Sequence, residues 1–132
     1  MAFTDAIRFV LVEDGVPNTL DDIRTSVIGN SRLEFDAVVA HGASNQHVVM
    51  NWLIANMQSF YLRSDVVAHV YTNHASGSTP DNTFDLDAGT WVYWHAGGQT
   101  ENPVTVNVTL GVYVTVPGAD DAHLKISVLQ NL

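Results

Sequence analysis

Residues 58–132 read QSFYLRSDVVAHVYTNHASGSTPDNTFDLDAGTWVYWHAGGQTENPVTVNVTLGVYVTVPGADDAHLKISVLQNL, and this stretch decides the fold. Short segments of alternating apolar and polar residues follow one another, and turn-forming residues end each of them. The segments are QSFYLR, VVAHVYTN, NTFDLDAG, TWVYWHA, VTVNVT, LGVYVTV and AHLKISVL, separated by loops such as HASGSTPD, GGQTENP and PGADD. Because side chains alternate between the two faces of a strand, this rhythm predicts a series of β-strands.

The start of the chain carries weaker signals. In AIRFVLVEDG, the side chains of Ile7, Phe9 and Leu11 share one face of an expected strand, EDGVPNT is turn-like, and IRTSVIG is the expected return strand. A helix over TLDDIRTSV is the alternative, because a threonine or an aspartate near its start would cap it. The Thr, Ser and Val residues that follow lower its helix propensity. We therefore expect residues 1–30 to form an N-terminal arm or hairpin.

The segments between the arm and residue 58 are of two kinds. RLEFDAVVA alternates well and predicts a half-buried strand with Leu33 and Phe35 on one face and Arg32 and Glu34 on the other. NQHVVMNWLIANMQSFYLR is ambiguous. We expect a strand, a connector carrying NWLIANM and a second strand, and a helix over 49–57 is the alternative because several apolar residues there have helical spacing.

The 132 residues are most simply one domain with its own core, because no repeat or linker divides them. Roughly eight to ten short strands without helical patterns between them predict an all-β fold. We expect an antiparallel β-sandwich of the jelly-roll kind over 31–132. Two stacked sheets would bury alternate side chains, here Phe60, Leu62, Val112, Val114, Leu124, Ile126 and Val128, together with either Trp91 and Tyr93 or Val92 and Trp94.

The composition excludes several classes of function. The net charge is −9, and the 5 Lys and Arg residues are scattered singly, so neither nucleic acid nor an anionic membrane is an expected partner. The chain has no cysteine, which excludes disulfides and thiolate chemistry. No apolar run approaches the roughly 20 residues of a membrane span, and MAFTDAIRF does not resemble a signal peptide. We expect a soluble protein made in a cytoplasm.

Metal and cofactor sites are not expected. The six histidines (His41, His47, His69, His74, His95 and His123) show no HxH or HExxH spacing, so they are interpreted as polar positions at strand ends and on solvent faces. STPDNTFDLDAG offers oxygen ligands but lacks the glycine and glutamate positions of an EF-hand. A looser calcium site that adds Asp120 and Asp121 is the alternative to an ordinary turn followed by a strand.

Enzymatic chemistry finds little support either. The chain has no GxSxG elbow and no phosphate-binding GxxxxGK loop, and sequence alone does not place two carboxylates at the separations that glycoside hydrolysis needs. The aromatic residues Tyr61, Trp91, Tyr93 and Trp94 suggest a sugar-stacking face. Because alternation separates Trp91 and Tyr93 from Val92 and Trp94, one of these pairs is expected in the core. We expect no catalytic residues.

Three segments, FYLRSDVVAHVYTN, GSTPDNTFDLDAGTWVYWHAGG and NPVTVNVTLGVYVTVPGADDAHLKISVLQ, together resemble a family of small structural proteins of tailed phages and prophages. In that family LxSD, TN before a Ser/Gly-rich turn, PDDTxxLxAG, a tryptophan-bearing strand, NP and YVTNxGxxxATLKIxVLQ follow in the same order. The resemblance covers residues 60–130. It consists of turns and core positions and contains no active site.

The resemblance implies a non-enzymatic virion protein with a β-sandwich body, namely a capsid decoration or cement protein. Such proteins bind the exterior of the assembled shell and bridge copies of the major capsid protein, often as dimers or trimers. A tail or baseplate-associated protein and a carbohydrate-binding module are the alternatives. No stretch of the first half aligns with the family, so we expect partner contacts in the arm. Phe3, Ile7 and Phe9 are the candidates, with ordinary core positions as their alternative.

Overall fold

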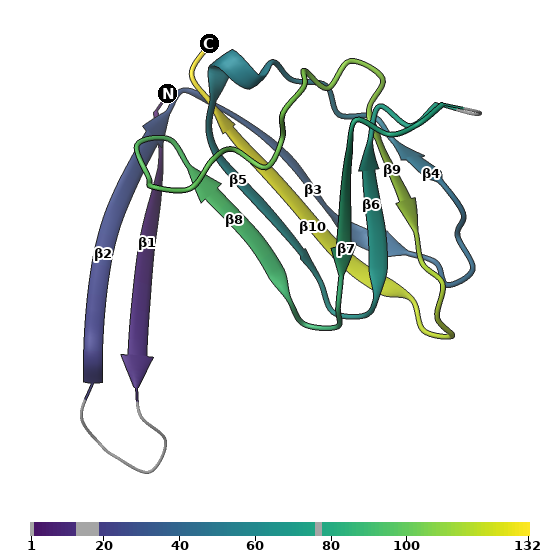
Figure 1. Ribbon diagram of the computed structural model, residues 1–132, viewed down its shortest axis with the longest axis horizontal. Coiled ribbons are helices and arrows are strands. Elements are labelled where there is room, and N and C mark those ends of the chain that lie inside the picture. Colours follow the sequence, from purple (N-terminus) through teal and green to yellow (C-terminus); the bar gives the residue numbers. More distant parts are fainter. Residues whose placement is uncertain (1, 13–18, 76–77) are drawn as a thin grey trace.

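The computed structural model describes residues 2–12, 19–75 and 78–132 (Figure 1). It contains a two-stranded ribbon, here called the arm, and two four-stranded sheets. The arm consists of β1 (Phe3–Val12) and β2 (Thr19–Gly29). The arm-side sheet contains β3 (Ser31–Val39), β10 (Ala122–Gln130), β5 (Met57–Ser64) and β8 (Trp91–His95). The far sheet contains β4 (Gln46–Val48), β9 (Val112–Thr115), β6 (Ala68–Thr72) and β7 (Asn82–Leu86).

The strand order is that of a jelly roll. The arm-side sheet runs β3-β10-β5-β8 and the far sheet runs β4-β9-β6-β7, and every pairing is antiparallel. Strands that follow one another from β3 to β6 alternate between the sheets, and the last strand pairs between β3 and β5, as two interleaved Greek keys require. The predicted all-β antiparallel sandwich with an N-terminal hairpin is confirmed.

The core lies between the two sheets and uses the alternate positions that the sequence predicts. Phe60 and Leu62 of β5 are 2% and 0% exposed, and the Phe60 ring lies 6.2 Å from Trp52 and 5.5 Å from Phe84. Each such side chain contributes roughly 1.5–3 kcal/mol when fully buried. All the positions expected in the core are buried: Phe60, Leu62, Val112, Val114, Leu124, Ile126 and Val128. Val92 and Trp94 are the pair that packs against the core, whereas Trp91 is 66% exposed.

The prediction of a strand over VTVNVT (residues 104–109) is wrong. Val104 and Val108 are buried, but Val108 makes only an isolated bridge with Trp52. Asparagine side chains accept hydrogen bonds here where a neighbouring strand would otherwise supply carbonyl groups. Asn102, Asn82 and Asn73 accept in this way from the backbone N–H groups of Val104, Thr105, Thr109 and Leu110.

Both helical alternatives are wrong. TLDDIRTSV belongs to β2, and β4 is joined to β5 through a connector with a single 3₁₀ turn, η1 (Ile54–Asn56). The residue before that turn, Leu53, makes no capping hydrogen bond, and the Asn107 side chain instead accepts from the backbone N–H of Ile54 through its Oδ1. The predicted order of strand, connector and strand is therefore confirmed.

The described strands of the arm meet the body at one end, the arm root (Figure 1). Its strands pair from Phe3 with Gly29 to Val12 with Thr19, with an irregularity near Val12, and the expected turn at 13–18 lies outside the described residues. A Cβ at Gly29 would lie 2.5 Å from the carbonyl oxygen of Gln130 and 2.8 Å from Cγ of Leu129, so only glycine permits this close crossing. From there the arm projects beyond the sandwich (Figure 1).

Candidate functional site

The outer face of the arm-side sheet, which points away from the core, is the surface that the arm overhangs. Its side chains are those that alternate with the core positions along each strand. They are Arg32, Glu34 and Asp36 on β3, His123, Lys125 and Ser127 on β10, Ser59, Tyr61 and Arg63 on β5, and Trp91, Tyr93 and His95 on β8.

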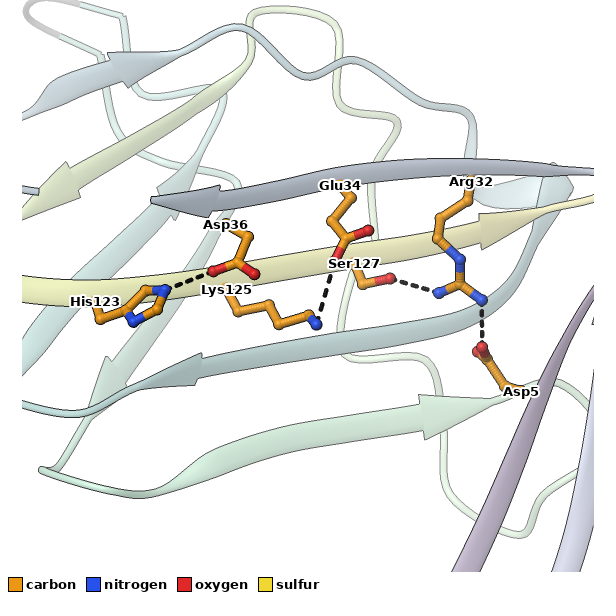
Figure 2. A network of polar contacts seen from close by, with 7 residues as sticks. All are labelled: Asp5, Arg32, Glu34, Asp36, His123, Lys125 and Ser127. Atoms are coloured by element: carbon orange, nitrogen blue, oxygen red, sulfur yellow. Dashed lines mark hydrogen bonds and ion pairs between the residues drawn. The ribbon is translucent and has the colours of Figure 1, made fainter. Parts of the chain in front are cut away.

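Figure 2 shows a row of polar contacts that follows β3 and β10 toward the arm. His123 Nε2 lies 2.5 Å from Asp36 Oδ1, and Lys125 Nζ lies 3.2 Å from Glu34 Oε1. Both contacts join side chains of the paired strands β10 and β3, which favours the observed register. Both pairs are about half exposed, so each contributes at most about 1 kcal/mol.

Asp5 of the arm ends this row and joins the arm to the body. Its carboxylate pairs with Arg32 and accepts a hydrogen bond from Ser59 Oγ, while Arg32 also donates to Ser127 Oγ at 2.7 Å. The guanidinium of Arg32 lies 5.8 Å from the centre of the Phe3 ring, within the range of a cation–π contact. One carboxylate therefore connects β1 with β3 and β5.

A cleft of about 730 Å³ lies between the arm and this outer face. Arm residues 4–8 form one wall, and Tyr61, Trp91 and Tyr93 supply aromatic surface from the sheet. The remaining lining is polar or charged: Arg32, Glu34, Lys125 and Ser127. Its size and its mixture of aromatic and polar groups match those of small-molecule binding sites in proteins.

The hydroxyl group of Tyr93 is a buried polar atom in this cleft. Tyr93 Oη has no hydrogen-bond partner among the described residues, although its ring is partly exposed. Burial, and then the negative charge of Asp5, raise the pKa of Tyr93 to about 12. The phenol therefore stays protonated at neutral pH and keeps a hydrogen bond to donate.

The cationic residues gather at the arm and on the outer face. The chain has 5 Lys and Arg residues against 14 acidic ones. Arg8 and Arg24 lie directly opposite each other on β1 and β2, and Arg32, Arg63 and Lys125 lie on the outer face. Cations that are scattered along the sequence thus lie on the arm and on one face of the body, where Arg32 and Lys125 pair with acids.

The histidines are placed in pairs with acids or rings. His41 and His69 each lie 2.6 Å from a carboxylate, of Asp121 and Asp85 respectively, while His47 stacks on Tyr113 at 4.6 Å. Within residues 2–12, 19–75 and 78–132, no three histidine or acidic side chains are grouped as metal ligands would be. The acids of the suspected calcium loop have other partners, since Asp81 accepts from Asn73 and Asp85 lies against His69.

The aromatic residues of the suspected sugar-stacking face divide between the two sides of the sheet. Tyr61 and Tyr93 are direct neighbours on β5 and β8, Trp91 lies two residues away on the same face, and all three line the cleft. Trp94 points the other way, against the core, and its Nε1 donates to the carbonyl oxygen of Thr100 at 3.1 Å.

The three arm residues proposed as partner contacts have different positions. Phe3 lies at the arm root beside Arg32, and Ile7 lines the cleft. The side chain of Phe9 lies outside the described residues. Sequence reasoning missed Asp5, because an isolated aspartate in a strand gives no sign of the body residues that it contacts.

Comparison of the chain with protein-family models, curated proteins and solved structures gives no match. In the part of the chain that the structure describes, no helix has the length and apolar character of a membrane span. What the protein does is therefore inferred from the arm, the cleft and their charges.

Proposed function

We propose that this protein is a non-enzymatic component of a tailed-phage virion, a decoration or cement protein that binds the exterior of the capsid shell. The observation that carries the proposal is the arm. Its strands have 10 and 11 residues, and in the described part of the chain they pair only with each other. Both outer edges of the ribbon therefore keep backbone donors and acceptors for another chain.

A two-stranded ribbon is marginally stable by itself, because it has too little apolar surface to bury. Such an arm gains order when a neighbouring sheet adds to one of its edges, which is a common way for extended segments to dock. A capsid shell presents the same edge many times, so weak contacts by each copy add up through avidity. The major capsid protein is the partner that this reasoning and the sequence resemblance over residues 60–130 favour.

Two arginines of the arm favour an acidic partner surface. Arg8 and Arg24 are exposed and lie opposite each other on β1 and β2. An acidic patch on the shell would complement both of them. We place the protein on the capsid exterior as a homo-oligomer, a dimer or a trimer, after synthesis in the host cytoplasm.

The test is cosedimentation of the purified protein with shells of its own phage that were assembled without it. Wild-type protein should saturate expanded shells at a fixed number of copies. Arg8→Gln with Arg24→Gln should bind at least about tenfold more weakly, because the steering and pairing of two charges are lost. Thr83→Glu with Thr109→Glu is the matched control, since both positions are exposed on the body and the net charge changes equally.

Failure of the wild-type protein to bind expanded shells would overturn the proposal. Binding to purified tails or baseplates instead would assign the protein to the tail. Equal weakening by the arm variant and the matched control would show that net charge, and not the arm, determines binding.

A further inference from the structure

We propose that the cleft between the arm and the outer face binds a saccharide that carries a carboxylate, such as a uronic or sialic acid unit. Three features support this ligand class: an exposed aromatic platform, a guanidinium beside it, and a buried hydroxyl group that lacks a partner. The site goes beyond capsid binding, because it would allow a decorated particle to adhere to acidic glycans.

The aromatic platform consists of Tyr61 from β5 and of Trp91 and Tyr93 from β8. Tyr61 and Tyr93 are directly paired across β5 and β8, and Trp91, one of the two tryptophans on β8, is 66% exposed. An aromatic residue that is left exposed in a cleft is ready to cover apolar area of a ligand. A pyranose ring has an apolar C–H face, and the Trp91 indole offers a flat surface against which it can pack.

Arg63 is the group that would receive the carboxylate. It lies directly opposite Trp91 in the strand register, and both line a shallow hollow with Tyr61 and Gly89 beside the main cleft. The carboxylates that line the main cleft have other cations, since Asp5 pairs with Arg32 and Glu34 pairs with Lys125. Asp36 and Asp65 share a second hollow with Arg63, and there Asp36 contacts the His123 ring while Asp65 accepts from the His123 backbone N–H. The Arg63 guanidinium is therefore positioned to form a two-pronged hydrogen-bonded pair with a ligand carboxylate.

Tyr93 supplies the third contact. A buried hydroxyl group without a hydrogen bond is costly, and a ligand hydroxyl placed in the cleft would satisfy it. Saccharides carry hydroxyl groups around the whole ring, whereas an acidic peptide side chain has none to offer next to its carboxylate. This contact favours an acidic sugar over an acidic peptide.

The test measures binding of the full chain to named oligosaccharides by calorimetry and by saturation-transfer NMR. The probes are 3′-sialyllactose and a hyaluronan tetrasaccharide as acidic sugars, lactose as the neutral sugar, and tetraglutamate as the acidic peptide. We expect both acidic sugars to bind at least about tenfold more tightly than lactose or tetraglutamate, because they add a charge-assisted hydrogen bond to the stacking contact.

Single substitutions test which side chain makes each contact with the sugar. Trp91→Ala should lower the affinity for all sugars by about tenfold or more, and Arg63→Gln should reduce the affinity for acidic sugars to that for lactose. Tyr93→Phe should lower the affinity for both acidic and neutral sugars several-fold. Leu53→Ala, an exposed apolar position in the β4–β5 connector, should leave binding unchanged.

Several results would overturn the proposal: no acidic sugar binds at millimolar concentration, tetraglutamate binds as tightly as they do, or Trp91→Ala retains full affinity. The outcome is separable from the capsid proposal. Trp91→Ala should still cosediment with shells, and Arg24→Gln, at an arm residue that does not line the cleft, should still bind sugars.

Discussion

The arm and the body are both antiparallel β-structure, but they are stabilised differently. The body places two sheets face to face around side chains that are almost fully buried, such as Leu62 and Leu124. The arm is a single layer that contacts the body at its root, through Asp5 and the close crossing at Gly29. The comparison teaches that identical strand pairing gives a stable domain only where a second layer covers it.

The arm and the body also differ in the charged side chains that face each other across neighbouring strands. In the body, the contacts of Lys125 with Glu34 and of His123 with Asp36 join β10 to β3 and support the register of the sheet. In the arm, the register places two arginines, Arg8 and Arg24, opposite each other.

The largest expected effect tests the body. Phe60→Ala removes a ring that packs between Trp52 and Phe84, so the free energy of unfolding should fall by about 3–5 kcal/mol in urea denaturation. Val38→Ala, at a 64% exposed site on β3, should change it by less than about 0.5 kcal/mol. Equal effects of the two variants would contradict a core between the sheets.

The second prediction concerns a loop connection of the body. Asn73 accepts from the backbone N–H groups of Thr109 and Leu110 and has a φ of +53°, so Asn73→Ala should cost about 3 kcal/mol. Asn73→Gly should recover about 1 kcal/mol, because glycine tolerates that backbone conformation. Both values come from chemical denaturation. If the alanine variant is as stable as wild type, the asparagine does not anchor this loop.

The third prediction tests the junction. A methyl group at Gly29 would collide with Gln130, so Gly29→Ala should loosen the arm root by about 1–3 kcal/mol. Hydrogen exchange should then speed up along β1 and β2 and stay unchanged in β6 and β7. Ser26→Ala, exposed on the same strand, is the control. Uniformly faster exchange would mean that arm and body unfold as one unit.

The fourth prediction measures how strongly the arm influences the body. The pKa of Tyr93 is about 12, raised from 10.0, so its folded state holds the proton more tightly than the unfolded state. Its contribution to stability is complete below pH 10 and is lost as the pH rises from 10 to 12. Tyr93→Phe should remove this alkaline loss and the latest tyrosinate absorbance step.

Asp5→Asn should shift that absorbance step to lower pH without abolishing the delay, because burial is the larger cause of the raised pKa. An unchanged step in Asp5→Asn would mean that the arm's carboxylate does not act on Tyr93.

The smallest expected effect lies on the body's surface, far from the arm. Hydrogen bonds from the backbone and then the ring of His41 lower the pKa of Asp121. Their stabilisation is present above pH 3.8 and is lost as the pH falls through the lower folded-state pKa. Asp121→Asn should therefore lose less stability than wild type as the pH falls below 3.8. The urea concentration at the unfolding midpoint, measured at each pH, reports this loss. If wild type and Asp121→Asn lose stability equally as the pH falls, the contact between His41 and Asp121 does not stabilise the fold.

The sequence was a good guide to strands and a poor guide to sites. Alternation identified the buried faces of β5, β9 and β10, because a core between two sheets imposes period two on each strand. It failed over residues 104–109, where the same alternation occurs but asparagine side chains satisfy the backbone. Of the site, Tyr61, Trp91 and Tyr93 were recognised as aromatic candidates, whereas Asp5 and Arg63 were not.

By itself, the amino-acid sequence predicted that this protein is all-β, that residues 31–132 form the sandwich, and that an N-terminal arm or hairpin precedes it. These properties are local, since they follow from alternation and turn residues. Only the tertiary structure decided that the hairpin overhangs one face of the sandwich and that Arg8, Arg32 and Lys125 line the cleft between them. Such contacts join residues far apart in the chain, and no local pattern records which strands the fold brings together.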